Sequence, residues 1–361
     1  MISINSNEKL ITKGIRRITK DDIVSQNTLL QYKFHVKGIR LMSDSNTVKL
    51  VDELNNARRI YRNGLLIVRN SMLEISAAKR VEIKPLNILV DKIMGSLSRN
   101  PDALLCVSRN KPQNDYTIAH SLSVCIFIAA FTQRLNIEEN EAKQIALGAL
   151  LGDVGKLRIS NEILNKPGEL TKKEFTEVKK HAKYTYALLY ASKCFTETTI
   201  RAATEHHERM DGSGYPFGLE ETQISNGGQM TAIADVYDAL ASPRVYQDAK
   251  EPKDVFKLMY SWKDSQFKKS MLKKFVRMVG MYPVGSMVAL SNAKLAVVVN
   301  HGIDDMLLPK VKTIFDLRNK ILLQKRECLD LEEMNAQNGV HIIRPIGRNE
   351  FNFNPISALG I

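Results

Sequence analysis

This sequence of 361 residues contains few cysteines and no long apolar run. The four cysteines are widely separated and form no Cys-x-x-Cys pair, which excludes a zinc ribbon and a disulfide framework. The longest apolar stretch, Val124–Phe131, has eight residues, whereas a membrane-spanning helix needs about 20. The first residues also contain no apolar signal segment. We therefore expect reduced thiols, no membrane span and a cytoplasmic location.

Acidic residues are too few to balance the basic ones. The chain has 52 Lys and Arg against 39 Asp and Glu, a net charge of +13. This excess favours an anionic partner such as nucleic acid, a membrane surface or a phosphate-bearing small molecule. No nucleic-acid recognition motif is present, so no specific nucleic-acid partner is expected. The basic stretch Lys268–Lys274 is interpreted as the exposed face of a helix whose Phe267, Met271 and Phe275 pack inward.

The spacing of apolar residues divides the chain into three parts. Near the start, residues 31–40 alternate like a strand, and residues 48–61 and 86–106 have helical spacing. From about 115 to 270 the pattern is helical nearly throughout, and Thr171–Glu174 predicts a capping box that begins one helix. Residues 284–302 and 311–323 each predict two strands joined by a turn. The sequence thus predicts a mainly α protein. Its parts are a small mixed α/β N-terminal domain (1–106), a helical domain (107–280) and a short β-rich C-terminal appendage (281–361).

Histidine is also scarce, yet four of the seven histidines lie in the helical part among acidic residues. Imidazole and carboxylate together suit Fe, Mn, Zn or Ni, and a carboxylate can bridge two ions. Bundle proteins build such sites from side chains on separate helices. The spacing alone is equally compatible with histidines that are hydrogen-bonded in a core. The candidate metal ligands are His120, Asp153, His181, His206, His207 and Asp235.

The sequence around these candidates resembles a known family. Residues His206–Pro216, HHERMDGSGYP, are similar to the signature of the HD-GYP family, metal-dependent phosphodiesterases that hydrolyse the bacterial messenger cyclic di-GMP. Asp115–Ser121 resembles the family's first ligand helix, Leu151–Lys156 its HD-x-G-K segment and Ala232–Leu240 its last ligand helix. The resemblance covers about 115 to 250. It implies that the helical part is an HD-type helical bundle.

The resemblance also implies roles for individual residues. The six candidates fall on metal-ligand positions, with Asp153 as the bridging carboxylate, for at most two divalent transition-metal ions (Fe, Mn, Ni or Zn). Asp153 and Lys156 are the expected catalytic residues. Lys156 and Arg244 fall on positions that hold the substrate phosphate, and Arg209 and Asp211 of the signature are further candidates for substrate binding. The implied substrate is cyclic di-GMP or a related cyclic dinucleotide. The loop Gly214-Tyr215-Pro216 is linked in the family to partner contacts, which makes diguanylate cyclases candidate partners.

At four positions this sequence departs from the family pattern. Gly152 replaces a histidine ligand, so one metal loses an imidazole donor. Tyr116 stands where three-metal members carry Glu, Gln247 where a second basic phosphate ligand is usual, and Thr185 where glycine is common. Two functions therefore stay open. One is a metal-dependent phosphodiesterase, weakened by these changes, that converts cyclic di-GMP to the linear dinucleotide. The other is a degenerate HD-GYP domain that acts as a cyclic-dinucleotide sensor or a protein-interaction scaffold.

Overall fold

The structure is a computed structural model, and its described residues form two units. They are residues 48–77, 81–109, 116–242, 249–262, 265–301, 305–335, 339–347 and 350. A helical unit extends to residue 278 and a β-rich unit follows from residue 279. The predicted strand at 31–40, together with Arg244 and Gln247, lies outside the described residues.

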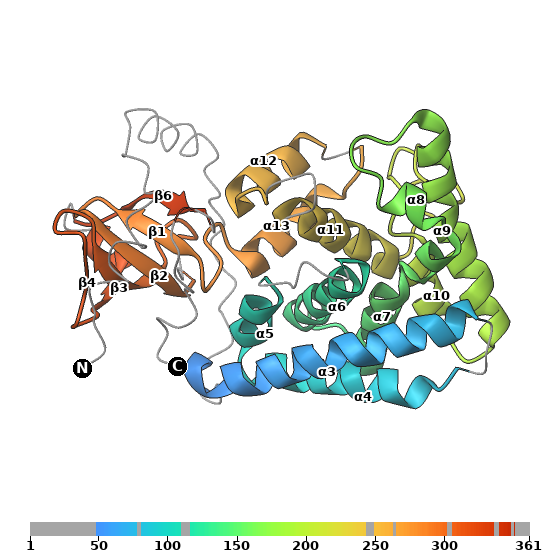
Figure 1. Cartoon of the computed structure of the whole chain (residues 1–361), viewed down its shortest axis with the longest axis horizontal. Helices are drawn as coiled ribbons and strands as arrows, with labels where there is room; N and C mark the ends of the chain where they lie inside the picture. Colours follow the sequence, from blue (N-terminus) through green and yellow to red (C-terminus); the bar gives the residue numbers. More distant parts are fainter. Residues whose placement is uncertain are drawn as a thin grey trace. The chain divides into compact units, whose positions relative to one another are not determined.

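Helix α6 (Tyr116–Arg134) is the central helix of the helical unit. It contacts α3, α4, α5, α7 and α11 (Figure 1). By length and composition α6 could cross a membrane, but 83% of its most apolar window is buried inside the protein. This burial is that of a core helix. The other helices are α3 (Leu50–Ser76), α4 (Ile83–Arg99), α5 (Pro101–Ser108), α7 (Glu139–Leu151), the 3₁₀ helix η1 (Val154–Arg158), α8 (Asn161–Leu164), α9 (Lys172–Ser192), α10 (Glu197–Thr204), α11 (Asn226–Ala241), α12 (Pro252–Ser261) and α13 (Lys269–Val279).

Aromatic side chains fix α11 and α13 against α6. The ring of Phe127 meets the edge of Tyr237 at a centroid distance of 5.2 Å, and Phe131 meets Phe275 at 5.3 Å. Such edge-to-face pairs each contribute about 0.5–1.5 kcal/mol beyond the burial of their area. On α13, Leu272 rather than the predicted Met271 is buried with Phe275. The contacts matter for the site described below because α6 and α11 each carry part of it.

Local signals explain where helices begin and end. The capping box at Thr171 is confirmed, since its hydroxyl accepts the Glu174 N–H and the Glu174 carboxylate accepts the Thr171 N–H. The helical spacing over 86–106 is confirmed, but it belongs to two helices: α4 ends at Arg99 and α5 begins at Pro101. The side chain of Asn100 accepts the first free N–H groups of α5, and proline suits the first helical position.

The β-rich unit contains one antiparallel sheet in the order β4-β3-β2-β1-β6, with β5 paired to β3. Both predicted strand pairs, β1 with β2 and β3 with β4, are confirmed. The first turn contains Ala293 at a positive φ of 62°. The strands are β1 (Met287–Leu290), β2 (Lys294–Asn300), β3 (Lys310–Asp316), β4 (Ile321–Leu322), β5 (Cys328–Asp330) and β6 (Ile342–Ile346), with the short helix α14 (Leu331–Asn335) before β6.

The mainly α fold with a β-rich C-terminal part agrees with the sequence prediction. Helices α3, α4 and α5, which the sequence assigned to the N-terminal domain of residues 1–106, pack on α6 in the helical unit. Their apolar faces need that contact to be buried. The division of the chain at residues 106 and 280 stays a proposal.

Candidate metal centre

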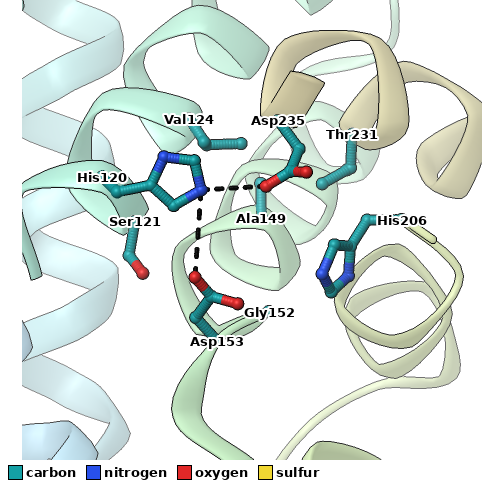
Figure 2. A pocket seen from close by; sticks show the side chains of 9 residues that line it. All are labelled: His120, Ser121, Val124, Ala149, Gly152, Asp153, His206, Thr231 and Asp235. Carbon is teal, nitrogen blue, oxygen red and sulfur yellow. Dashed lines mark hydrogen bonds and ion pairs between the residues drawn. The ribbon is translucent and has the colours of Figure 1, made fainter. Parts of the chain in front are cut away.

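The six candidate ligands meet in the helical unit with Asp153 between two groups of side chains. Asp153 Oδ2 lies 3.8 Å from His120 Nε2, and Asp153 Oδ1 lies 3.6 Å from His181 Nε2. On the first side, His120 Nε2 is 2.8 Å from Asp235 Oδ1 (Figure 2). On the second side, the ligand atoms of His181, His206 and His207 all lie within 4.8 Å of one another. One carboxylate thus faces both groups.

Asp153 is held in place by the chain that follows α7. Gly152 is the C-cap residue that follows α7, and Asp153 is the N-cap residue that precedes η1. The Thr185 hydroxyl of α9 donates to the Gly152 carbonyl at 2.8 Å and accepts the Gly155 N–H at 3.0 Å. A Cβ on Gly155 would collide with the carbonyl oxygen of His181, so only glycine lets η1 lie this close to α9. Thr185, one of the four departures, therefore fixes Asp153 relative to His181.

Hydrogen bonds set the tautomers of two imidazoles. His181 Nδ1 donates to the Val178 carbonyl at 2.7 Å, and His206 Nδ1 donates to the Ala203 carbonyl at 2.8 Å. Each Nε2 then keeps its lone pair for a ligand. Within the part of the chain that the structure describes, His181 Nε2 and Asp153 Oδ1 are buried without a hydrogen-bond partner. Because such orphaned atoms are costly, the pair fits a bound cation.

The protonation states also fit a divalent ion. Burial lowers the pKa of His181 to about 4 and the pKa of His207 well below its usual value. Burial alone would raise the pKa of Asp153, but Lys156 and the nearby imidazoles lower it below its ordinary range. The same holds for Asp235, where the hydrogen bond from His120 outweighs burial. Neutral imidazoles and ionised carboxylates are the forms that bind metals.

His120 is held by two carboxylates of α11. Its Nδ1 lies 2.6 Å from Asp238 Oδ2 while its Nε2 faces Asp235. Burial alone would lower the pKa of His120, but these two hydrogen bonds raise it to about 9. A metal ion at Nε2 would replace the proton there. Sequence reasoning gave Asp238 no role, although its position three residues after Asp235 places both on one helix face.

The predicted substrate-binding residues are distributed differently. Lys156 Nζ lies 2.7 Å from Asp153 Oδ2, at the centre of the site. Arg209 and Asp211 are exposed, and the Asp211 carboxylate accepts the N–H and O–H of Ser213 in a turn. Among the residues described here, no hydrogen bond or ion pair joins Arg209 or Asp211 to the candidate ligands. Arg244 lies outside those residues.

The loop after His207 forms one wall of the site. The ring of Tyr215 stacks on the ring of His207 at a centroid distance of 4.6 Å, and the backbone N–H of Tyr215 donates to the His207 carbonyl. The buried carboxylate of Glu208 accepts the N–H groups of Phe217 and Leu219 at 2.7 and 3.0 Å. Sequence reasoning assigned no role to Glu208. Its carboxylate fixes the loop because charge-assisted hydrogen bonds are strong when buried.

Comparison with known proteins decides the family. The family model described as HD domain matches residues 106–270. Over 274 residues the chain is 34% identical to "Cyclic di-GMP phosphodiesterase PA4108" of Pseudomonas aeruginosa, covering 76% of this chain and 66% of that protein. The chain belongs to the HD-GYP family. Proteins with HD domains bind divalent metals, and the imidazole cluster of this HD-GYP chain offers the donors for one.

Two further similarities are more limited. The chain is 39% identical to "3'3'-cGAMP-specific phosphodiesterase 3" of Vibrio cholerae over 137 residues, 38% of this chain and 30% of that protein. It thus spans just under two thirds of the first relative and less than a third of the second. The solved structure of Bd1817, an HDG"Y"P protein from Bdellovibrio bacteriovorus, matches with a TM-score of 0.54 and 18% identity, covering 72% of this chain and 81% of that one. This match supports the HD-GYP fold alone.

Proposed function

We propose that this chain is a metal-dependent phosphodiesterase that hydrolyses one phosphodiester bond of cyclic di-GMP to give the linear dinucleotide. The observation that carries the proposal is the position of Asp153, whose two oxygens face His120 and His181 at 3.8 and 3.6 Å. The relatives named cyclic di-GMP and cGAMP phosphodiesterases support a cyclic dinucleotide as the substrate.

The proposed roles follow from the site. The six candidate ligands would hold at most two divalent ions, which supply Lewis-acid activation of water and of the phosphate oxygens when bound. Lys156 is the described cation nearest to Asp153 and is proposed to hold the substrate phosphate and to neutralise its charge. Arg244, Arg209 and Asp211 remain proposed substrate ligands. The proposed location is the cytoplasm.

Diguanylate cyclases are the proposed partners of the Gly214-Tyr215-Pro216 loop. Beside this loop, Phe217 is 48% exposed and meets the edge of Tyr186 on α9. Tyr186 stacks in turn on Tyr190, which is 65% exposed. Exposed aromatic clusters of this kind are typical of protein interfaces. A Phe217→Ser variant should bind a purified diguanylate cyclase more weakly than the wild type. Equal binding would exclude the cluster from the interface.

A second candidate function is favoured by Gly152. Without the imidazole that this family usually has there, the domain would bind a cyclic dinucleotide, or a partner protein, without hydrolysing the nucleotide. The two candidates differ in one measurable respect, which is turnover.

The test is hydrolysis by protein of known metal content. Protein purified without oxygen and assayed for metals is incubated with cyclic di-GMP, and the products are separated by chromatography. We expect the linear dinucleotide from the wild type and none from Asp153→Asn. Lys180→Met, which changes a surface lysine of α9, is the control and should keep the activity. Metal-loaded wild type that binds cyclic di-GMP without product would favour the sensor.

A further inference from the structure

The two groups of ligands beside Asp153 offer different donors. His181, His206 and His207 supply three imidazoles, and Asp153 completes a set of four. Such nitrogen-rich sets bind Zn²⁺, Fe²⁺ and similar ions strongly. On the other side, His120 supplies one imidazole, and Asp153 and Asp235 supply carboxylate oxygens. A set of three that is mostly oxygen suits a hard ion such as Mn²⁺, which then keeps several waters.

The set formed by His120, Asp153 and Asp235 has only three donors because residue 152 is glycine, which offers no side-chain ligand. Gly152 lines a small pocket together with His120, Asp153, His206 and Asp235 (Figure 2). The cavity measures about 10 Å³, which is room for about one water molecule. Gly152 has ordinary helical angles, φ −52° and ψ −38°, so the backbone does not require glycine.

The other polar groups of this pocket do not replace the imidazole. The Thr231 hydroxyl donates to the Gly227 carbonyl at 2.8 Å. Ser121 Oγ is buried and, within the described residues, has no hydrogen-bond partner, so a water in the pocket would satisfy it. His120 itself is tethered through Nδ1 to Asp238. A metal ion bound by His120, Asp153 and Asp235 would therefore need water molecules as its remaining ligands.

From this asymmetry we infer that the two metal positions of the chain are unequal. The position at Asp153, His181, His206 and His207 retains its ion, whereas the position at His120, Asp153 and Asp235 takes an exchangeable hard ion such as Mn²⁺. The free concentration of that ion then regulates the site. The regulatory part rests on the proposed function, but the inequality of the two positions does not.

The expected size follows from the lost ligand. Loss of a group that hydrogen-bonds to a metal ligand already weakens metal binding by about 10–100-fold. Loss of an imidazole that itself coordinates the metal should therefore weaken binding by at least about 10-fold. Gly152→His should reverse this. An added Cβ would lie 3.3 Å from His206 Cε1, so the ring of His206 must shift by a few tenths of an ångström to accept it. Gly152→Ala adds the same Cβ without a donor and is the matched control.

The test counts the ions and measures their exchange in the full chain. Protein is desalted, its metals are assayed, and Mn²⁺ is then titrated with detection by electron paramagnetic resonance. We expect about one retained ion and one reversible Mn²⁺ site in the wild type and in Gly152→Ala, and at least about 10-fold tighter Mn²⁺ binding in Gly152→His. Asp235→Asn should lose the reversible Mn²⁺ site and keep the retained ion. His181→Ala should lose the retained ion and keep the reversible Mn²⁺ site.

Several results would overturn the inference. Two ions retained by the desalted wild type would contradict it, as would loss of the retained ion in Asp235→Asn. If Gly152→His does not fold, the inference is still tested by comparing the ion content of Asp235→Asn with that of His181→Ala. Hydrolysis measured on the same samples separates this inference from the proposed function. Two classes of ion without hydrolysis at any Mn²⁺ concentration would refute only the phosphodiesterase. Full hydrolysis that Mn²⁺ does not change would refute only the regulation.

Discussion

Asp238 offers a direct test of how the metal centre is organised, because it touches no proposed ion yet holds one of the ligands. Its Oδ2 lies 2.6 Å from His120 Nδ1, and both side chains are about 4% exposed. In Asp238→Asn the side chain keeps its shape and one acceptor oxygen but loses its charge. His120 would then be oriented less firmly and would be a weaker donor at Nε2.

The size of the effect can be derived from this contact. Outer carboxylates of metal-bound histidines typically affect metal affinity by about 10–100-fold, which is about 1.4–2.8 kcal/mol. Because the amide can still accept from Nδ1, Asp238→Asn should lie near the lower limit. Asp238→Leu, which removes the acceptor, should lie near the upper limit.

The assay is the Mn²⁺ titration, with the unfolding midpoint measured in parallel. Asp91→Asn is the control, since Asp91 is a surface carboxylate of α4 that is 53% exposed and paired with Lys143. It should leave the Mn²⁺ affinity unchanged. The ion held by His181 should also be unaffected in the Asp238 variants. Equal Mn²⁺ affinity in wild type, Asp238→Asn and Asp238→Leu would refute the reasoning, because His120 would then be oriented by other contacts.

Three more predictions concern stability and the loop. Thr185→Val should lower the free energy of unfolding by about 1–3 kcal/mol in urea titrations, because the Gly152 carbonyl and the Gly155 N–H lose their hydrogen-bond partner. The control Thr176→Val, at an exposed position of α9, should lower the free energy of unfolding by less. Contacts with Arg99, Ser96 and Asn56 outweigh burial and lower the pKa of Glu53 to about 2. The resulting stability, about 3 kcal/mol, should be present above pH 4.5 and lost as the pH falls towards 2. Glu53→Gln should remove this dependence in acid titrations followed by circular dichroism. Glu208→Gln should speed proteolytic cleavage within residues 212–219, and an unchanged cleavage rate would contradict the role of Glu208 in holding the loop.

The sequence allowed the prediction of features that depend on neighbouring residues or on an extended motif. The capping box at Thr171 and the strand pairs after residue 284 needed only local patterns. The approach of the six ligands to one another followed from the resemblance to the HD-GYP family. Spacing alone did not predict it, since His120 is separated from Asp235 by 115 positions.

Other features could not be predicted because they arise where distant segments meet. Apolar spacing continues through Asn100, so the break between α4 and α5 was visible only in the capping chemistry. Asp238 and Thr185 have functions only when α11 reaches α6 and α9 reaches η1. Their residue types alone are equally compatible with a surface carboxylate and an ordinary core hydroxyl.

The close packing of η1 on α9 has a mechanical consequence. Because the backbone at Gly155 touches α9 and Thr185 bonds both ends of the Gly152–Gly155 segment, Asp153 and His181 should move as one rigid piece. His120 and Asp235 belong to a second piece, α6 with α11. A protein that binds the exposed aromatic side chains of α9 would therefore leave the Asp153–His181 distance intact. A movement of the first piece relative to the second would instead change the gap between Asp153 and His120, which are 3.8 Å apart.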